Sequence, residues 1–143
     1  MARRNTAGTM SRENLEVAAR LYAMYERGDI DGMLAGMDPE VEFDVTDRLP
    51  DEGVFRGREA YRTFLERGFD IWAEFRIEVE ELLDAGDAIV AFIHSIAVGD
   101  GSGAEVEERI AHVAWMRDGT PYRIKVFSDR ERALEAAGLS NTY

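Results

Sequence analysis

Apolar residues in the first part of the chain recur at helical spacing. Five of them are three or four positions apart and would form one apolar face: Leu15, Ala18, Ala19, Tyr22 and Tyr25. This spacing, with Ser11 as a cap, predicts a helix over residues 11–27. Asp29 can cap a short second helix over residues 30–37, which Pro39 prevents from continuing.

A third helix is predicted over residues 58–75. Its apolar side would carry Ala60, Phe64, Leu65, Phe69 and Trp72. Gly68 interrupts the pattern and would allow the helix to bend. Before this helix, residues 41–45 alternate between apolar and polar side chains as in a strand, and residues 47–53 have the composition of a loop.

The second half of the chain alternates with the period of strands. The four predicted strands cover residues 76–83, 88–98, 105–117 and 122–127, with short turns rich in glycine and aspartate between them. A last short helix is predicted from Ser128 to just before Gly138. Helices followed by an antiparallel meander are typical of the α+β class, because parallel α/β folds alternate strands with helices. A curved, mostly antiparallel sheet with helices on its concave side can enclose a cavity for a small ligand.

The composition excludes several kinds of partner. The net charge of −12 repels nucleic acid and anionic lipid, so we expect neither as a partner. The chain has no cysteine, which excludes disulfides, thiolate catalysis and a zinc site built on cysteine. No apolar run approaches the about 18 residues that a membrane-spanning helix needs.

The N-terminal residues lack the pattern of a targeting segment. Arg3 and Arg4 are not followed by the apolar stretch of a secretory signal. We therefore predict a disordered tail over residues 1–10, a single domain over residues 11–143 and a cytoplasmic location.

Short motifs spread over residues 11–139 share a resemblance. They are Gly28-Asp29-Ile30-Asp31, Asp38-Pro39-Glu40-Val41-Glu42-Phe43, Phe55-Arg56-Gly57-Arg58-Glu59-Ala60, Arg117-Asp118-Gly119 and Phe127-Ser128-Asp129. Together they resemble the SnoaL-like family of the nuclear transport factor 2-like superfamily. The resemblance implies a cone-shaped α+β fold around one cavity, often in homodimers that pack through the sheet. Its members include ketosteroid isomerase, polyketide cyclases, scytalone dehydratase and limonene epoxide hydrolase, so the fold alone does not select a reaction.

Asp44, at the end of the first strand, is the first catalytic candidate. The resemblance places it where ketosteroid isomerase has an aspartate that removes a proton from a carbon beside a carbonyl. An apolar cavity would raise the pKa of the Asp44 carboxyl and make it a better base. The structural alternative is a strand-end aspartate that is solvated or accepts a hydrogen bond from a nearby backbone N–H.

His112 is the second catalytic candidate. A hairpin turn centred near Gly101 would place His112 opposite Val90 across the sheet. Five residues would then share one apolar, cavity-facing side: Val90, Phe92, His94, Ile110 and His112. The resemblance puts His112 where ketosteroid isomerase has a protonated acid that hydrogen-bonds a developing oxyanion, and a histidine can donate the same bond. The structural alternative is a core histidine satisfied by a buried partner.

Three further residues are predicted to contribute to ligand binding. Tyr22 follows Leu21, which the resemblance puts at the place of the oxyanion-hole tyrosine of ketosteroid isomerase. Tyr22 either reaches the cavity or is an aromatic residue that packs the helix against the sheet. Trp72 would form part of the cavity wall, whereas Trp115 would face outward and suit a homodimer contact through the sheet. Asp129 is either a second carboxylate in the cavity or the cap of the last helix, and which side of residues 122–127 faces inward stays open.

These residues indicate two functions. The first is a cofactor-independent acid/base enzyme of the isomerase, cyclase or dehydratase type that acts on a small apolar carbonyl or cyclic compound. In it Asp44 would move a proton and His112 would stabilise the oxyanion. The second is a non-catalytic binding module for a small hydrophobic molecule. No metal is expected, because the two histidines and a distant aspartate lack a recognised ligand spacing.

Overall fold

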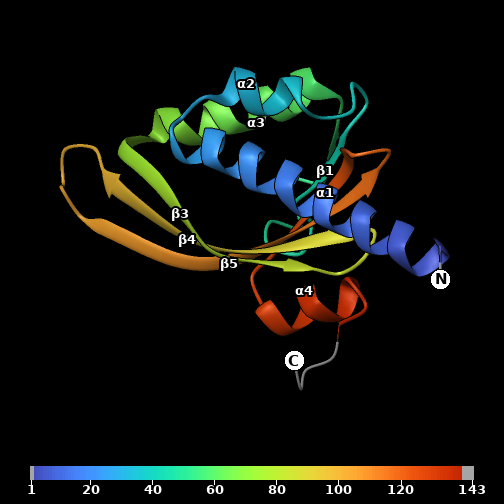
Figure 1. Cartoon of the computed structure of the whole chain (residues 1–143). Coiled ribbons are helices and arrows are strands. Elements are labelled where there is room, and N and C mark those ends of the chain that lie inside the picture. The colour runs from blue at the N-terminus through green and yellow to red at the C-terminus, as the bar shows by residue number, and fades with distance from the viewer. Residues whose placement is uncertain (1, 140–143) are drawn as a thin grey trace.

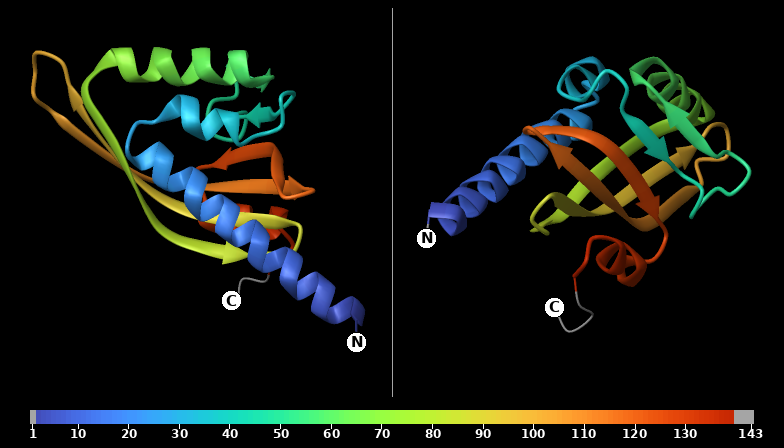
Figure 2. Two further views of the ribbon diagram at one scale, coloured as in Figure 1. Left: turned by 45° about the horizontal axis from the view of Figure 1, so that its top comes forward. Right: turned by 90° about the vertical axis from the view of Figure 1, so that its right-hand side faces the viewer.

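The computed structural model describes residues 2–139 and contains a curved sheet with helices on both of its faces (Figure 1). The helices are α1 (Ala2–Glu26), α2 (Ile30–Ala35), α3 (Arg58–Ile71) and α4 (Arg130–Ala136). The strands are β1 (Glu42–Asp44), β2 (Val54–Arg56), β3 (Trp72–Asp84), β4 (Ala88–Gly99), β5 (Glu105–Arg117) and β6 (Thr120–Phe127). The long strands curl toward α1, α2 and α3, while α4 lies on the opposite, outer face (Figure 2). The predicted α+β class is therefore confirmed.

The strands are ordered β2-β1-β6-β5-β4-β3 across the sheet. Strands β3 to β6 form the predicted antiparallel meander, which needs only short turns between neighbours. Strand β1 pairs in parallel with β6, so the first strand of the chain lies beside the last one. The sequence did not predict β2, a three-residue strand that pairs with β1 at the sheet edge.

The register between β4 and β5 differs by one residue from the prediction. Val98 pairs with Glu105, so the turn centre falls between Gly101 and Ser102 rather than on Gly101. His112 consequently lies opposite Ala91, and Val90 lies opposite Val113. Because side chains alternate between the two faces, this shift moves every predicted partner of His112 on β4 to the other side of the sheet.

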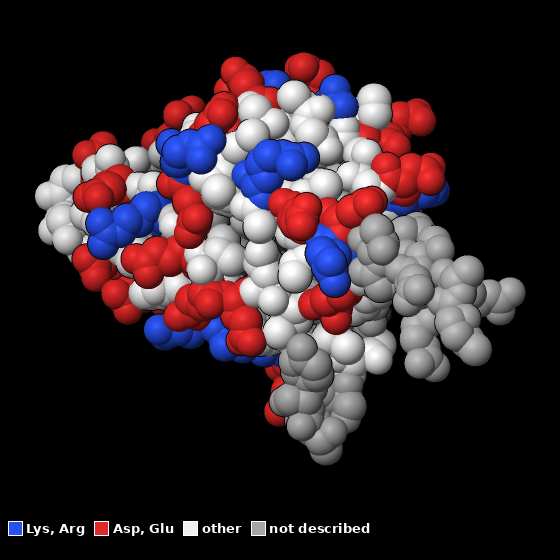
Figure 3. All heavy atoms as spheres, in the orientation of Figure 1, with Lys and Arg blue, Asp and Glu red and all other residues white. Residues whose placement is uncertain are grey.

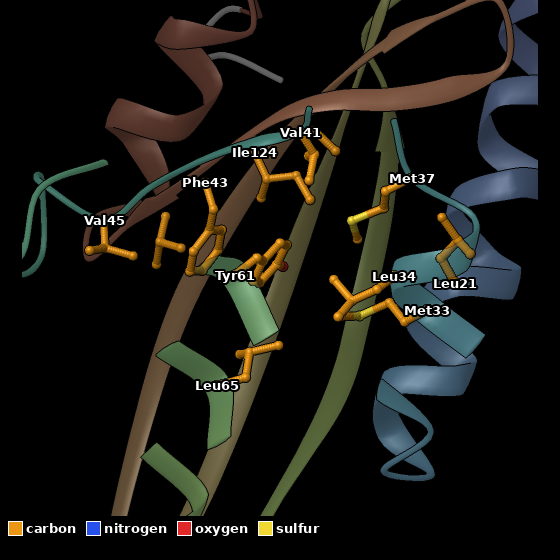
Figure 4. Close-up of a cluster of buried hydrophobic side chains, with 12 residues drawn as sticks. Leu21, Met33, Leu34, Met37, Val41, Phe43, Val45, Tyr61, Leu65 and Ile124 are labelled. Atoms are coloured by element: carbon orange, nitrogen blue, oxygen red, sulfur yellow. The ribbon is translucent and has the colours of Figure 1, made fainter. Parts of the chain in front are cut away.

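The inner face of the sheet packs against α1, α2 and α3 through a buried apolar cluster. Figure 4 shows members of this cluster from β1, β6 and all three helices pointing toward one another: Leu21, Met33, Leu34, Met37, Val41, Phe43, Val45, Tyr61, Leu65 and Ile124. Phe43 of β1 stacks on Tyr61 of α3, with ring centroids 3.9 Å apart. This stacking, together with burial of both rings, fixes α3 over β1, next to the sheet edge that β2 forms.

Helix α4 covers part of the outer face. Its Ala133 and Leu134 pack with Val90 and Phe92 of β4 in a second apolar cluster. The helix begins at Asp129, whose side chain accepts a hydrogen bond from the Glu131 backbone N–H at 2.8 Å. Asp129 is therefore the cap of the last helix, which was one of the two roles predicted for it.

Trp115 lies on the outer face, in the row of side chains opposite to His112. The guanidinium carbon of Arg123 lies 4.6 Å from a ring centroid of Trp115. The homodimer expected through this face stays a prediction.

Two element boundaries differ from those predicted. Helix α1 begins at Ala2, so residues 2–10 continue the helix that the sequence predicted to begin near Ser11. These residues contain no proline, and a helix extends more easily than it nucleates. The division into a tail over residues 1–10 and one domain over residues 11–143 stays a prediction. Helix α3 ends at Ile71, and Trp72 begins β3, because residues 72–75 pair with residues 97–99 of β4. Strand pairing here overrides the helical spacing of the apolar residues.

Charged side chains of both signs are interspersed over the face seen in Figure 3. This mixture matches the ion pairs between neighbouring elements, for example Arg62 of α3 with Asp31 of α2 and Arg130 of α4 with Glu80 of β3. Among residues 2–139, no helix is both long and apolar enough to cross a membrane.

Leu34→Ala tests the inner cluster, because Leu34 of α2 is only 1% exposed. We expect the free energy of unfolding, measured by urea denaturation, to fall by about 2–5 kcal/mol. Val54→Ala on the edge strand β2 is the matched control, since Val54 is 41% exposed and its truncation should change stability by about 0.5 kcal/mol or less. Equal losses in the two variants would contradict this packing.

Candidate functional site

A cavity of about 300 Å³ lies between the inner face of the sheet, α3 and the loop that follows β1. Its walls are mostly apolar and include Phe64 and Phe69 of α3, Trp72 and Phe75 of β3, Ile93 of β4 and Ile110 of β5. Five polar residues interrupt this apolar surface: Tyr25, Arg48, Ser95, Glu108 and His112. A mostly apolar cavity with a few polar groups is the usual form of a small-molecule site.

His112 borders the cavity and is almost fully buried, at 4% exposure. Its Nδ1 atom is 2.9 Å from the hydroxyl of Tyr22 on α1, which is a hydrogen bond between a helix and the sheet. Within residues 2–139, this is the hydrogen bond that the protein makes to the His112 ring. The second ring nitrogen, Nε2, is therefore available to a molecule in the cavity.

His112 and its two neighbouring tyrosines are uncharged at neutral pH. Burial is the larger cause and the positive charge of Arg48 the smaller one, and together they lower the pKa of His112 to about 4. Burial also raises the pKa of Tyr22 far above its ordinary value and that of Tyr25 to about 12. The imidazole is thus neutral and both phenols are protonated, so these three side chains can form hydrogen bonds without carrying a charge of their own.

Tyr22 and Tyr25 occupy different positions relative to the cavity. Tyr22 lies behind His112 and holds its ring, whereas Tyr25, one helical turn later, lines the cavity itself. Leu21 is buried in the inner apolar cluster. The sequence had assigned Tyr25 only to the apolar face of the helix; its three-residue spacing from Tyr22 was the signal that both could point toward the sheet.

Asp44 does not line the cavity, which contradicts its prediction as a base there. Parallel pairing with β6 sets Asp44 beside Lys125, while the inward row carries Phe43 and Ile124. The Asp44 carboxylate accepts hydrogen bonds from the Thr46 backbone N–H at 2.9 Å and hydroxyl at 2.6 Å. These bonds form the turn that begins the loop after β1, which agrees with the structural alternative predicted for Asp44.

The charge state of Asp44 agrees with this structural role. Burial raises the pKa of Asp44, but the hydrogen bonds from Thr46 and the positive charges of Lys125 and Arg123 outweigh it. Both cations lie 3.8 Å from the Oδ2 atom. The pKa of Asp44 is therefore below its ordinary value, which is the opposite of what a general base in an apolar cavity requires.

The loop after β1 contributes two cavity residues that sequence reasoning missed, Arg48 and Leu49. Their backbone N–H groups donate to the carbonyl of Val45 at 3.1 and 2.7 Å. Arg48 forms an ion pair with Glu108 of β5, which also borders the cavity. The alternation along β5 already put Glu108 on the same side as His112, whereas no periodic pattern exists for a loop residue such as Arg48.

Two of the predicted site residues, Trp72 and Ile110, are in the cavity wall. Three others lie on the opposite side of the sheet. Val90 and Phe92 face the outer side, where they pack beneath α4. His94 is also on the outer side: its Nδ1 is 3.9 Å from a Glu78 oxygen and its Nε2 is 3.6 Å from a Glu107 oxygen. The one-residue shift of register accounts for all three outward residues.

Of the two sides of β6, the one that carries Ile124 and Val126 faces inward, and Val126 reaches the cavity. This settles the orientation that the sequence left open. In the part of the chain that the structure describes, no three His, Cys, Asp or Glu side chains are grouped as metal ligands would be.

Comparisons with known proteins agree with the geometry. A family model of the SnoaL-like domain matches residues 18–124. The crystal structure of TerC co-crystallised with polyporic acid is similar, with a TM-score of 0.71 and 25% identity over 88% of this chain and 98% of that one. No match was found among curated proteins.

Two other solved structures show the same fold. One is a nuclear transport factor 2-like protein of unknown function from Burkholderia pseudomallei K96243, with a TM-score of 0.72 and 20% identity over 86% of this chain and 95% of that one. The other is a putative polyketide cyclase from Xanthomonas campestris pv. campestris, with a TM-score of 0.67 and 20% identity over 90% and 98%. Because the family model spans most of the chain, from α1 into β6, the chain belongs to the SnoaL-like domain family.

Proposed function

We propose that this chain binds a small, mostly apolar carbonyl or cyclic compound in its cavity and transfers a proton on it without a cofactor. The observation that carries the proposal is the buried hydrogen bond between Tyr22 and His112 at the cavity wall. If the Tyr22 hydroxyl donates to Nδ1, the ring proton is on Nε2 and points to the ligand. A neutral imidazole then serves as a hydrogen-bond donor toward the ligand's oxygen.

The chemistry follows from two polar residues of the cavity wall, Glu108 and His112. Glu108 is the carboxylate that borders the cavity, so it takes the role of base that Asp44 does not fill. It accepts a proton from the carbon beside the carbonyl, and the electron pair moves onto the carbonyl oxygen. The Nε2–H of His112 stabilises this oxyanion, and a well-aimed donor of this kind contributes about 3 kcal/mol to the transition state. Return of the proton to another carbon completes an isomerisation.

A non-catalytic binding module is the second candidate. Two points favour it: Glu108 is already paired with Arg48, and Leu21, which the resemblance puts at the place of the oxyanion-hole tyrosine of ketosteroid isomerase, is buried in the inner apolar cluster. In this function His112, Tyr25 and Ser95 orient a bound molecule by hydrogen bonds, and the apolar wall supplies the affinity.

The two candidates differ in what His112→Gln and Glu108→Gln do. Compounds that bind would be found by native mass spectrometry and then incubated with the protein to detect turnover. For an enzyme, we expect His112→Gln to lower kcat about 100-fold or more with a smaller change in KM, because the lost hydrogen bond acts in the transition state. Glu108→Gln should abolish turnover.

The chain offers matched controls on the outer face of the same strands, His94→Gln and Glu107→Gln. Both should keep full activity. A ligand that is bound but recovered unchanged, with affinity reduced in His112→Gln, would instead identify the binding module. Full activity in both His112→Gln and Glu108→Gln would exclude the mechanism.

Burial of His112 also predicts a dependence of stability on pH. The pKa of His112 is about 4 in the folded chain, against an ordinary value of 6.5. Between these values the unfolded chain binds a proton that the folded chain does not, so stability is complete above the upper value and falls as the pH is lowered. From pH 6.5 to 4, wild type should lose on the order of 3 kcal/mol more than His112→Gln, measured by urea denaturation. Parallel pH profiles of the two proteins would show that His112 is not buried in its neutral form.

A further inference from the structure

Arg48 and Glu108 are the charged residues among those that line the cavity in the described part of the chain. They form an ion pair with each other, and they differ in burial: the Arg48 side chain is 27% exposed and that of Glu108 is 45% exposed. Glu108 is therefore the more hydrated partner and can turn fully into solvent more easily than Arg48 can. If the pair separates, the positive charge is the one that stays at the cavity.

The loop that carries Arg48 is also held by contacts that do not involve Glu108. The neighbouring Asp47 points the other way and receives two hydrogen bonds from Arg132 of α4, at 3.1 and 2.9 Å, and one from the Ser128 backbone N–H at 3.2 Å. Such two-pronged arginine–carboxylate contacts restrict geometry strongly. The loop is thus attached to α4 from outside while its next residue reaches the cavity from within.

The inner surroundings of Arg48 also suit a negative charge. Tyr25, Ser95 and His112 border the same cavity, and each can donate a hydrogen bond. The charge of Arg48 contributes to the lowered pKa of His112 and acts to lower that of Tyr25, so it lies close to both. A negatively charged oxygen placed here would meet one cation and several neutral donors.

We propose that the ligand carries a negatively charged oxygen on its apolar body, such as a carboxylate, phenolate or enolate, and that this oxygen replaces Glu108 as the partner of Arg48. This inference rests on the proposed function and adds the class of ligand. The exchange also releases the Glu108 carboxylate from its ion pair at the moment when the ligand is bound. Glu108 then becomes free to accept a proton from that ligand.

Two fluorescent probes with the same aromatic body test the exchange. Anilinonaphthalene sulfonate carries a negative group, and phenylnaphthylamine lacks it. In titrations of the folded chain, Arg48→Gln should weaken binding of the sulfonate probe about tenfold and leave binding of the neutral probe nearly unchanged, because one charge-assisted contact is lost. Glu108→Gln should strengthen binding of the sulfonate probe several-fold, since it removes the competing carboxylate.

Two control variants locate the effect. Arg109→Gln on the outer face, where Arg109 lies 3.5 Å from Glu80, should alter neither probe. Ala97→Phe, which fills part of the cavity, should weaken both probes while circular dichroism shows an unchanged fold. Equal effects of Arg48→Gln on both probes, or no gain in Glu108→Gln, would overturn the exchange. Failure of wild type to bind the neutral probe would overturn the proposed binding function itself.

Discussion

The hydrogen bond between Tyr22 and His112 determines how the rest of the site is arranged. It joins the first helix to the fifth strand inside an apolar interior, where an unsatisfied polar group costs about 1–3 kcal/mol. Each of the two side chains therefore supplies the hydrogen-bond partner that allows the other to be buried. Since Nδ1 is engaged with Tyr22, Nε2 is the ring nitrogen that the proposed function assigns to the ligand, and since the ring is buried, it stays neutral.

The two faces of the sheet have separate roles. The inner face carries the apolar walls and the polar groups that a ligand would meet. The outer face carries charged groups that shape the loop after β1: Asp44 begins its turn through Thr46, and Asp47 attaches it to Arg132 of α4. The two carboxylates thus act on the cavity indirectly, by holding the loop from which Arg48 reaches it.

Local patterns predicted the elements well but not how they meet. Alternation within β5 placed Ile110, His112 and Glu108 on one face, and the position of Asp129 identified the start of α4. The pairing with β4 depends on where a glycine-rich turn is centred. A shift of the turn centre by half a residue moved Val90, Phe92 and His94 from the predicted inner face to the outer face. Asp44 faced outward for a similar reason, since its side is set by the parallel pairing of β1 with β6, a contact between distant parts of the chain that no local spacing encodes.

The central claim is that His112 is a neutral hydrogen-bond donor toward the cavity, with its proton on Nε2. A nitrogen–proton NMR correlation spectrum of the histidine rings measures this directly, and the chain has only two histidines, which His112→Gln would assign. At neutral pH the account predicts a protonated Nε2 and an unprotonated Nδ1 that accepts from Tyr22, with the Nε2 signal shifting when a ligand binds. A proton on Nδ1, or a positively charged ring at neutral pH, would contradict it.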